Sequence, residues 1–323
     1  MPRPLSLGLE HTHVLITGGA GLIGSAVARA FFAEGAHVSS IDVADPSPPP
    51  EPSPSQPPDP PSPSGTLTHY RASVADEPSF TRAWRAAVRA HGPVQCCVAL
   101  AGLDLSVLEK HERATETLGL EAFMRTMEVN VGGVWVAGRE WLRGVRAARE
   151  QQGEEGEEEK EEKEEKEEKE EKEGGGAATG RIRNCSLVIV GSESGWFGER
   201  ARPDYAAAKS AVQGGLLRSL AAEAGRVRGG GVRVNAVAPG PVDTPRFREE
   251  CRNDPEQLWL DAQATTGLAE PVPMEAVARS ILFLASENFS SHVHGQVLNV
   301  DSGKQGKLLW TKEQIEARTA GER

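Results

Sequence analysis

The chain has 323 residues, of which 26% are charged and 38% hydrophobic, and its formal net charge is −11. Residues 154–173 hold 14 Glu and 5 Lys, so this one segment carries −9 of that charge. The remainder is nearly neutral, which argues against nucleic acid as a partner and says nothing about an active site. No apolar run approaches the ~18 residues needed to span a bilayer, so we expect no membrane insertion.

The amino terminus and the cysteines indicate a reducing compartment. The first 13 residues contain neither a continuous apolar stretch nor a small-residue cleavage pattern, so no secretory signal is expected. The cysteines at positions 96, 97, 185 and 251 show neither metal-ligand spacing nor a disulfide framework. We therefore expect reduced core thiols, no metal site, and a location in the cytoplasm or an organelle interior.

The first predicted elements enclose a glycine-rich turn. Residues 13–17 predict a strand, residues 22–33 a helix with one apolar face, and residues 36–41 a second strand. Between the first two lies TGGAGLIG, with Gly18, Gly21 and Gly24 in GxxGxxG spacing. Such glycines let the chain turn tightly and approach a pyrophosphate, whose charge the following helix N-terminus favours.

Asp42 ends the second predicted strand, 18 residues after Gly24. An acidic side chain at this place accepts hydrogen bonds from an adenosine ribose, and its charge repels a 2′-phosphate. Neither Lys nor Arg stands between Gly18 and Gly24 or just after Asp42. The sequence therefore favours NAD over NADP as the cofactor.

Two low-complexity segments interrupt the pattern. Residues 46–64 contain 11 prolines, which predicts a disordered, polyproline-like insert where a crossover helix would be usual. Residues 151–176 form a Glu/Lys-rich insert, predicted to be a solvated helical spike or a disordered tract because it lacks an apolar stripe. We predict one domain over residues 10–310 around these inserts, with residues 311–323 as a polar C-terminal tail.

Strand and helix patterns alternate through the rest of the chain. Strands are predicted at 94–100, 187–190, 232–238 and 296–300, and the clearest helices at 121–150, 203–224 and 274–285. Such alternation is typical of a parallel sheet covered by helices on both faces. The predicted fold class is therefore α/β, a doubly wound parallel sheet (Rossmann fold) in a single domain.

Polar residues with catalytic potential follow the middle strands. Tyr205 and Lys209 form YAAAK, a spacing that puts both side chains on one helix face. Ser192 lies 13 residues before Tyr205 at the end of a predicted strand, and Asn130 lies upstream in EVNVGG. Each of these features alone is common, since a serine often forms a turn and an asparagine a polar helix face. All of these features in this order and at this spacing are an uncommon combination.

In these motifs the sequence resembles the short-chain dehydrogenase/reductase (SDR) family over about residues 13–303, apart from the two inserts. The matching segments also include VNAVAPGPVDT at 234–244 and GQVLNVDSG at 295–303. The resemblance implies four catalytic residues, which are Asn130, Ser192, Tyr205 and Lys209. It implies cofactor contacts from Gly18, Gly21, Leu22, Ile23, Gly24, Asp42, Ser73, Val74, Ala101, Gly102, Tyr205, Lys209, Pro239, Gly240, Val242 and Thr244.

The chemistry explains these residue types. Hydride transfer at a carbonyl carbon requires a proton to move at its oxygen, yet only about one unperturbed tyrosine in a thousand is ionised at pH 7. A nearby ammonium favours tyrosinate, which makes Tyr205 the expected base in oxidation and acid in reduction. In the scheme that the resemblance implies, Ser192 holds the substrate oxygen, Lys209 also holds ribose hydroxyls, and Asn130 fixes a relay water.

Three departures from the family pattern stand out. The glycine spacing is TGxxGxxG, as in the family's extended branch, whereas the later motifs resemble the single-domain branch. Ala99 and Leu100 replace a usual asparagine pair, and Ser73 replaces an aspartate that often contacts adenine. Residues 245–273 are expected to form a variable lid over the substrate, most simply as a solvated amphipathic helix.

The expected function is NAD-dependent hydride transfer between nicotinamide and a secondary alcohol or its ketone, with a polyol, sugar-like or hydroxyacyl substrate. Three alternatives remain: an NADPH-dependent 3-oxoacyl reductase, an epimerase or dehydratase that retains NAD, and a non-catalytic cofactor-binding interaction protein that uses the inserts. The resemblance also implies a homotetramer or dimer, packed through the helices near Asn130 and after Tyr205.

Overall fold

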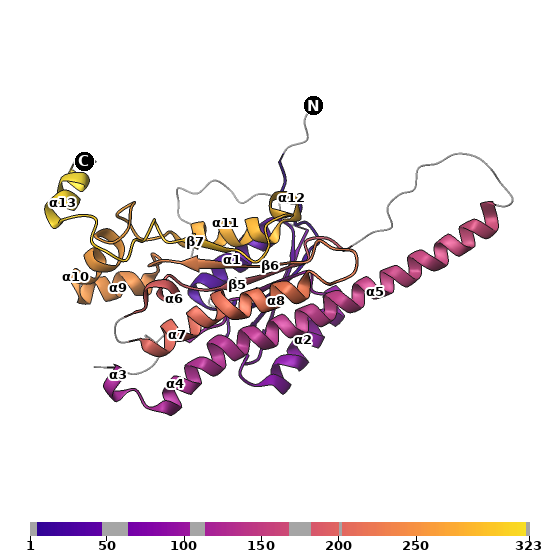
Figure 1. The fold of residues 1–323 in the computed structure, drawn as a ribbon, viewed down its shortest axis with the longest axis horizontal. Coiled ribbons are helices and arrows are strands. Elements are labelled where there is room, and N and C mark those ends of the chain that lie inside the picture. Colours follow the sequence, from indigo (N-terminus) through magenta and orange to yellow (C-terminus); the bar gives the residue numbers. More distant parts are fainter. Residues whose placement is uncertain (1–4, 47–63, 104–113, 168–181, 200–201, 321–323) are drawn as a thin grey trace.

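The fold is a single parallel sheet between two layers of helices (Figure 1). The computed structural model describes residues 5–46, 64–103, 114–167, 182–199 and 202–320, without the side chains of residues 114, 153–167, 255 and 319–320. The strand order is β3-β2-β1-β4-β5-β6-β7. The strands are β1 (His13–Thr17), β2 (His37–Asp42), β3 (Thr66–Arg71), β4 (Cys96–Ala99), β5 (Ser186–Val190), β6 (Arg233–Pro239) and β7 (Val297–Val300). The predicted fold class is confirmed.

The strand order reverses between β1 and β4, and this reversal determines where a ligand fits. β1 pairs with β2 on one side and with β4 on the other, in registers that include Val14↔Val38 and Val14↔Cys96. Doubly wound sheets bind ligands outside the carboxyl ends of the strands at such a switch point. The glycine turn after β1 lies at this point.

Helices cover both faces of the sheet. On one face α1 (Leu22–Ala33) and α11 (Met274–Ala285) bury Val27, Phe31 and Ile281. On the other face α2 (Glu77–His91), α5 (Gly133–Glu167) and α8 (Leu217–Ala224) bury Phe80, Trp141 and Leu217. The other longer helices are α4 (Leu120–Met127), α7 (Pro203–Ala211), α9 (Pro245–Asn253) and α13 (Lys312–Ala320). Short helices are α3 (Ala114–Thr117), α6 (Ser194–Phe197), α10 (Pro255–Gln257) and α12 (Glu287–Ser290), and π-helical turns are η2 (Glu128–Gly132), η3 (Val212–Leu216) and η4 (Leu258–Gln263).

The structure refines the predicted elements in two ways. The helices predicted at 121–150 and 203–224 are each divided by a π turn, η2 and η3, which apolar periodicity does not reveal. β3 and α2 were not predicted as elements. β3 is a half-exposed edge strand with little apolar pattern. α2 buries Phe80 and Trp84, and Asp76 caps its N-terminus by accepting a hydrogen bond from Ser79 N.

The predicted inserts are only partly visible. Almost all of residues 46–64, and residues 168–176, lie outside the described residues. The earlier part of the Glu/Lys-rich segment continues α5, which projects away from the body of the protein (Figure 1). In the predicted tail, α13 packs onto the body, because Ile315 is buried and Arg318 donates to Leu268 O at 3.0 Å. No described helix is both long and apolar enough to cross a membrane.

Three of the four cysteines are core residues, and Cys251 on the surface helix α9 is partly exposed. All four are free thiols, and Cys96, Cys97 and Cys185 are buried. Burial raises the pKa of Cys96 to about 12 and raises that of Cys97 well above its ordinary value. These thiols therefore stay protonated and contribute packing rather than reactivity.

A histidine buried at the amino end of β1 makes stability depend on pH. His13 Nδ1 donates to Gly92 O at 2.8 Å, its Nε2 accepts from Ser39 Oγ at 3.0 Å, and burial lowers its pKa from 6.5 to about 4. In the unfolded chain His13 takes up a proton near pH 6.5, whereas in the folded protein it does so only near pH 4. The contribution of neutral His13 is therefore complete above pH 6.5 and is lost as the pH falls towards 4, by roughly 3 kcal/mol.

Urea unfolding at several pH values measures this loss. His13→Gln should flatten the decline in the free energy of unfolding between pH 6.5 and 4. The exposed His292 provides a control, and His292→Gln should leave the slope unchanged. An equal slope in wild type and His13→Gln would contradict the assignment.

Candidate active site

The glycine turn after β1 is built too tightly for side chains. Gly18 has φ +75°, and a Cβ there would lie 2.7 Å from Ala101 Cα. A Cβ at Gly24 would collide with Gly18 O, and one at Gly19 with the Ser40 side chain. The turn therefore presents bare backbone at the N-terminus of α1, where an anion is favoured.

Asp42 lies directly beside this turn. Its Oδ2 accepts from Ala20 N at 3.0 Å and its Oδ1 from Ala44 N at 3.1 Å. The carboxylate is half-buried at the carboxyl end of β2. Negative charge therefore stands at the edge of the predicted dinucleotide cradle, although sequence alone does not reveal the bond to Ala20.

The loop after β4 lacks the usual asparagine pair and is held instead by the side chains of Thr17 and Asn130. Thr17 Oγ1 accepts from both Leu100 N and Ala101 N at 3.1 Å. Asn130, on η2, accepts from Leu103 N at 2.6 Å through Oδ1 and donates to Leu103 O at 3.0 Å through Nδ2. Thr17 and Asn130 thus hold the loop from opposite ends. Sequence reasoning missed this role of Thr17.

Asn130 and Lys209 meet beside Gly102. A Cβ on Gly102 would lie 3.4 Å from Asn130 Oδ1 and 3.7 Å from Lys209 Nζ. Both side chains are buried, with Asn130 1% and Lys209 5% exposed. The structure therefore brings together residues that lie 79 positions apart in the chain.

Tyr205 and Lys209 share one face of α7. Lys209 Nζ lies 5.5 Å from the centroid of the Tyr205 ring and donates to Val190 O at 2.8 Å. Val190 ends β5, two residues before Ser192, so the lysine connects the Tyr205 helix to the serine loop. A buried ammonium at this distance favours the ionised form of a phenol.

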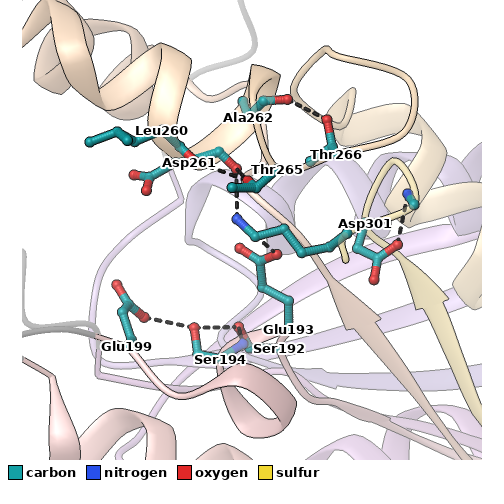
Figure 2. A network of polar contacts seen from close by, with 12 residues as sticks. Ser192, Glu193, Ser194, Glu199, Leu260, Asp261, Ala262, Thr265, Thr266 and Asp301 are labelled. Carbon is teal, nitrogen blue, oxygen red and sulfur yellow. Dashed lines mark hydrogen bonds and ion pairs between the residues drawn. The ribbon is translucent and has the colours of Figure 1, made fainter. Parts of the chain in front are cut away.

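Ser192 belongs to a chain of hydroxyl groups (Figure 2). Its Oγ donates to Ser194 Oγ at 3.2 Å and accepts from Ser194 N at 3.2 Å. Ser194 Oγ in turn donates to Glu199 Oε2 at 2.6 Å. These contacts orient the side chain of Ser192 through Ser194 and Glu199, two residues that the sequence motifs did not indicate.

A second polar cluster joins the serine loop to the lid. Lys304 Nζ lies 3.4 Å from Glu193 Oε2 and donates to Asp261 O at 2.7 Å. Burial raises the pKa of Glu193 to about 7, although Lys304 opposes the rise, and burial also raises the pKa of Asp261. The ammonium thus ties η4 to the residue after Ser192. No motif in the sequence pointed to Lys304.

The remaining predicted cofactor residues line the same edge of the sheet. Pro239 ends β6, and a Cβ on Gly240 would lie 2.8 Å from Asp301 Cα. Val242 bridges to Val272, and Thr244 caps α9 by accepting from Phe247 N at 3.0 Å. On the other side of the switch point, Ser73 and Val74 follow β3, and Leu22 and Ile23 open α1.

The lid region, residues 245–273, consists of α9, α10 and η4 followed by a loop. Two of its arginines already have acidic partners: Arg246 pairs with Glu250 at 3.2 Å and Arg248 with Asp243 at 2.6 Å. α9 has no fully buried residue, which fits the expected solvated helix. Among the described residues, no group of three His, Cys, Asp or Glu side chains is placed to hold a metal ion.

Known proteins resemble this chain over nearly its whole length. A family model described as "short chain dehydrogenase" matches residues 12–154, and one described as "Enoyl-(Acyl carrier protein) reductase" matches residues 177–305. Cis-4-hydroxycyclohexanecarboxylate dehydrogenase of Sinomonas cyclohexanicum is 30% identical over 90% of this chain and 94% of its own. Short-chain dehydrogenase reductase 5 of Arabidopsis thaliana is 30% identical over 91% of this chain and 95% of its own.

Solved structures agree on the fold. Levodione reductase superposes with a TM-score of 0.64 at 22% identity, covering 91% of this chain and 97% of its own. A short-chain type dehydrogenase/reductase from Mycobacterium ulcerans gives 0.68 at 23% identity, covering 94% of this chain and 93% of its own. The family models and the full-length relatives together show that this chain belongs to the short-chain dehydrogenase/reductase family of oxidoreductases.

Proposed function

We propose that the protein is an NAD-dependent oxidoreductase that transfers hydride between nicotinamide and a secondary alcohol or its ketone. The observation that carries this proposal is the meeting of Asn130 and Lys209 beside Gly102, with the Lys209 ammonium 5.5 Å from the Tyr205 ring. Lys209 also binds the strand that leads to Ser192. Proton-transfer groups therefore converge at the edge of the sheet where the glycine turn lies.

The turn fits a dinucleotide. A Cβ at Gly18, Gly19 or Gly24 would collide with neighbouring atoms, so only bare backbone fits there, and the amides that open α1 suit a pyrophosphate. Asp42 would hold the adenosine ribose, and its carboxylate would repel a 2′-phosphate. Pro239, Gly240, Val242 and Thr244 would border the nicotinamide. When bound, NAD supplies the hydride acceptor.

The protein's own residues then handle the proton. Tyr205 would take the proton from the substrate hydroxyl in oxidation and return it in reduction. The Lys209 ammonium would stabilise the tyrosinate and bind ribose hydroxyls. Ser192 would turn its hydroxyl from Ser194 towards the substrate oxygen. Asn130 would help to hold a water that connects Lys209 to solvent.

The substrate class is proposed from this chemistry together with the full-length relatives. Cis-4-hydroxycyclohexanecarboxylate dehydrogenase and glucose 1-dehydrogenase (28% identical over 94% of this chain) are both named as dehydrogenases of compounds that carry hydroxyl groups. We propose a ring or polyol secondary alcohol. The 3-oxoacyl-[acyl-carrier-protein] reductase of Thermotoga maritima is 40% identical over only 38% of this chain. Because of this match, a 3-oxoacyl substrate is included in the experiment below as the alternative.

A substrate panel tests the function. Purified protein is incubated with NAD and cyclic hydroxy acids, polyols and sugars, and with NADPH and a 3-oxoacyl thioester, and NADH or NADPH is followed by absorbance. NADH formation with any secondary alcohol supports the proposal. Faster NADPH consumption with the thioester would replace it by the acyl reductase. Silence with retained NAD would favour a redox-neutral or non-catalytic protein.

Cofactor preference gives a separate prediction. Asp42→Ala removes the carboxylate that would repel a 2′-phosphate and would hold the ribose. We expect kcat/KM with NAD to fall and that with NADP to rise, so that their ratio drops by about 10- to 100-fold. Asp45→Ala, which changes an exposed carboxylate three residues further on, is the matched control. An unchanged ratio in Asp42→Ala would exclude this role.

We also propose a homodimer or homotetramer in a reducing compartment. Exposed apolar side chains on α4 and α5, Met124 and Trp135, support self-association through these helices. The four free thiols support the compartment. Light scattering of wild type and Trp135→Glu tests the assembly, since a charge at a buried contact should shift the mass towards the monomer.

A further inference from the structure

Gln213 is a fully buried polar residue that the mechanism above does not use. It is 1% exposed and lies in the π turn η3, directly after α7. π turns within helices occur frequently at functional sites. The other π turn beside the site, η2, carries Asn130, whose amide binds the backbone of the loop after β4. Gln213 makes the equivalent contact after β5.

The side-chain amide of Gln213 binds the backbone of Ser192. Its Oε1 accepts from Ser192 N at 2.9 Å. A Cβ on Gly191 would collide with Oε1, and a Cβ on Gly195 would lie 2.6 Å from Nε2. The two glycines on either side of Ser192 thus make room for this one side chain.

The contact extends the face that carries Tyr205 and Lys209. These three residues follow one another at steps of four along a continuous helical run, so they lie along one side of it. Lys209 Nζ donates to Val190 O at 2.8 Å, and Gln213 Oε1 accepts from Ser192 N. Lys209 and Gln213 therefore bind the backbone of the residues that precede and follow Gly191.

The contact leaves the side-chain amide nitrogen of Gln213, Nε2, buried and without a hydrogen-bond acceptor among the described residues. A buried donor without a partner is unfavourable, so stability alone does not account for a glutamine here. An apolar side chain would fill the space but would leave Ser192 N without its acceptor.

We propose that Gln213 is a positioning residue that sets Ser192 relative to Tyr205. This inference rests on the proposed function, in which both hydroxyl groups address one substrate oxygen. Small misplacements of a group that orients substrate are costly, since about 1 Å can reduce turnover 10²-fold. Gln213 holds the serine backbone to the helix of Tyr205, while Ser194 orients the serine hydroxyl.

The test is a double-mutant cycle on the complete protein with its best substrate. Gln213→Leu should reduce kcat by about 10- to 100-fold, with the Kd for NADH and the pH profile unchanged and the Tm within about 4 °C of wild type. If Gln213 acts through Ser192, then Ser192→Ala/Gln213→Leu should turn over within about two-fold of Ser192→Ala. Losses that multiply would overturn the inference.

A matched control is Gln95→Leu. Gln95 Oε1 accepts from His13 N at 2.8 Å, so it makes the same kind of contact at the opposite end of the sheet. This variant should retain wild-type kcat. A kcat loss in Gln95→Leu equal to that in Gln213→Leu would show a general effect on the fold and would overturn the proposal.

A stability cycle tests the packing without any substrate. Gly191→Ala should lower the Tm in the wild-type background, since all three atoms nearest its Cβ belong to Gln213. In the Gln213→Ala background the same change should cost much less. Absence of that relief would overturn the contact. Failure of wild type to turn over any substrate would instead count against the proposed function, and the stability cycle would still report on the contact.

Discussion

Tyr205→Phe is expected to reduce turnover by about 10³-fold while leaving the Kd for NADH unchanged. The phenol would move the proton at the substrate oxygen, and a positioned acid or base contributes about 10²- to 10⁴-fold. Phenylalanine retains the ring beneath Lys209 Nζ and removes only the hydroxyl. Initial rates of NADH formation, with NADH fluorescence titration in parallel, measure both quantities.

The chain offers a matched control for this change. It contains two tyrosines, and the other, Tyr70, lies on the edge strand β3. Tyr70→Phe should keep wild-type turnover. Substantial activity in Tyr205→Phe would exclude this tyrosine as the acid/base, and the family's mechanism would then not describe this protein.

Lys209→Met should have the second largest effect. If the 5.5 Å from Lys209 Nζ to the Tyr205 ring centroid is taken as the charge separation, an effective dielectric constant near 20 gives about 3 kcal/mol, which corresponds to about two pH units. Loss of the ammonium should therefore lower kcat/KM at pH 7 by about 10²-fold and move the rising limb of the pH profile to higher pH by about two units. Part of the activity should return at alkaline pH.

Lys307→Met is the control, because Lys307 is an exposed lysine well outside the YAAAK segment. It should leave both the rate and the pH profile as in wild type. A uniform loss in Lys209→Met, with no movement of the profile, would mean that the lysine acts through Val190 and the serine loop rather than through its charge.

Local patterns were sufficient for much of this protein. The turn TGGAGLIG, the acidic residue that ends β2 and the alternation of strand and helix predicted a doubly wound sheet, and the structure has one. These features are readable because each depends on residues within about 20 positions: glycine where backbone must approach a phosphate, and apolar periods of two or 3.6. The YAAAK spacing likewise places two side chains on one face without knowledge of the fold.

Contacts between distant segments required the tertiary structure. Asn130 and Lys209 meet only because η2 and α7 pack side by side, and Lys304 reaches Glu193 from beyond β7. Gln213 looked like an ordinary helical residue, and its importance appears only when its amide is seen to accept from Ser192 N.

The division has a physical reason. The fold class, the glycine turn and the identity of the chemical groups could be predicted from the residues alone, because propensity and periodicity act over short stretches of chain. The edge strand β3, the π turns and the partners of Ser192 became known from the folded structure. These depend on which side chains satisfy buried backbone donors and acceptors across elements, and that choice is made when the elements pack.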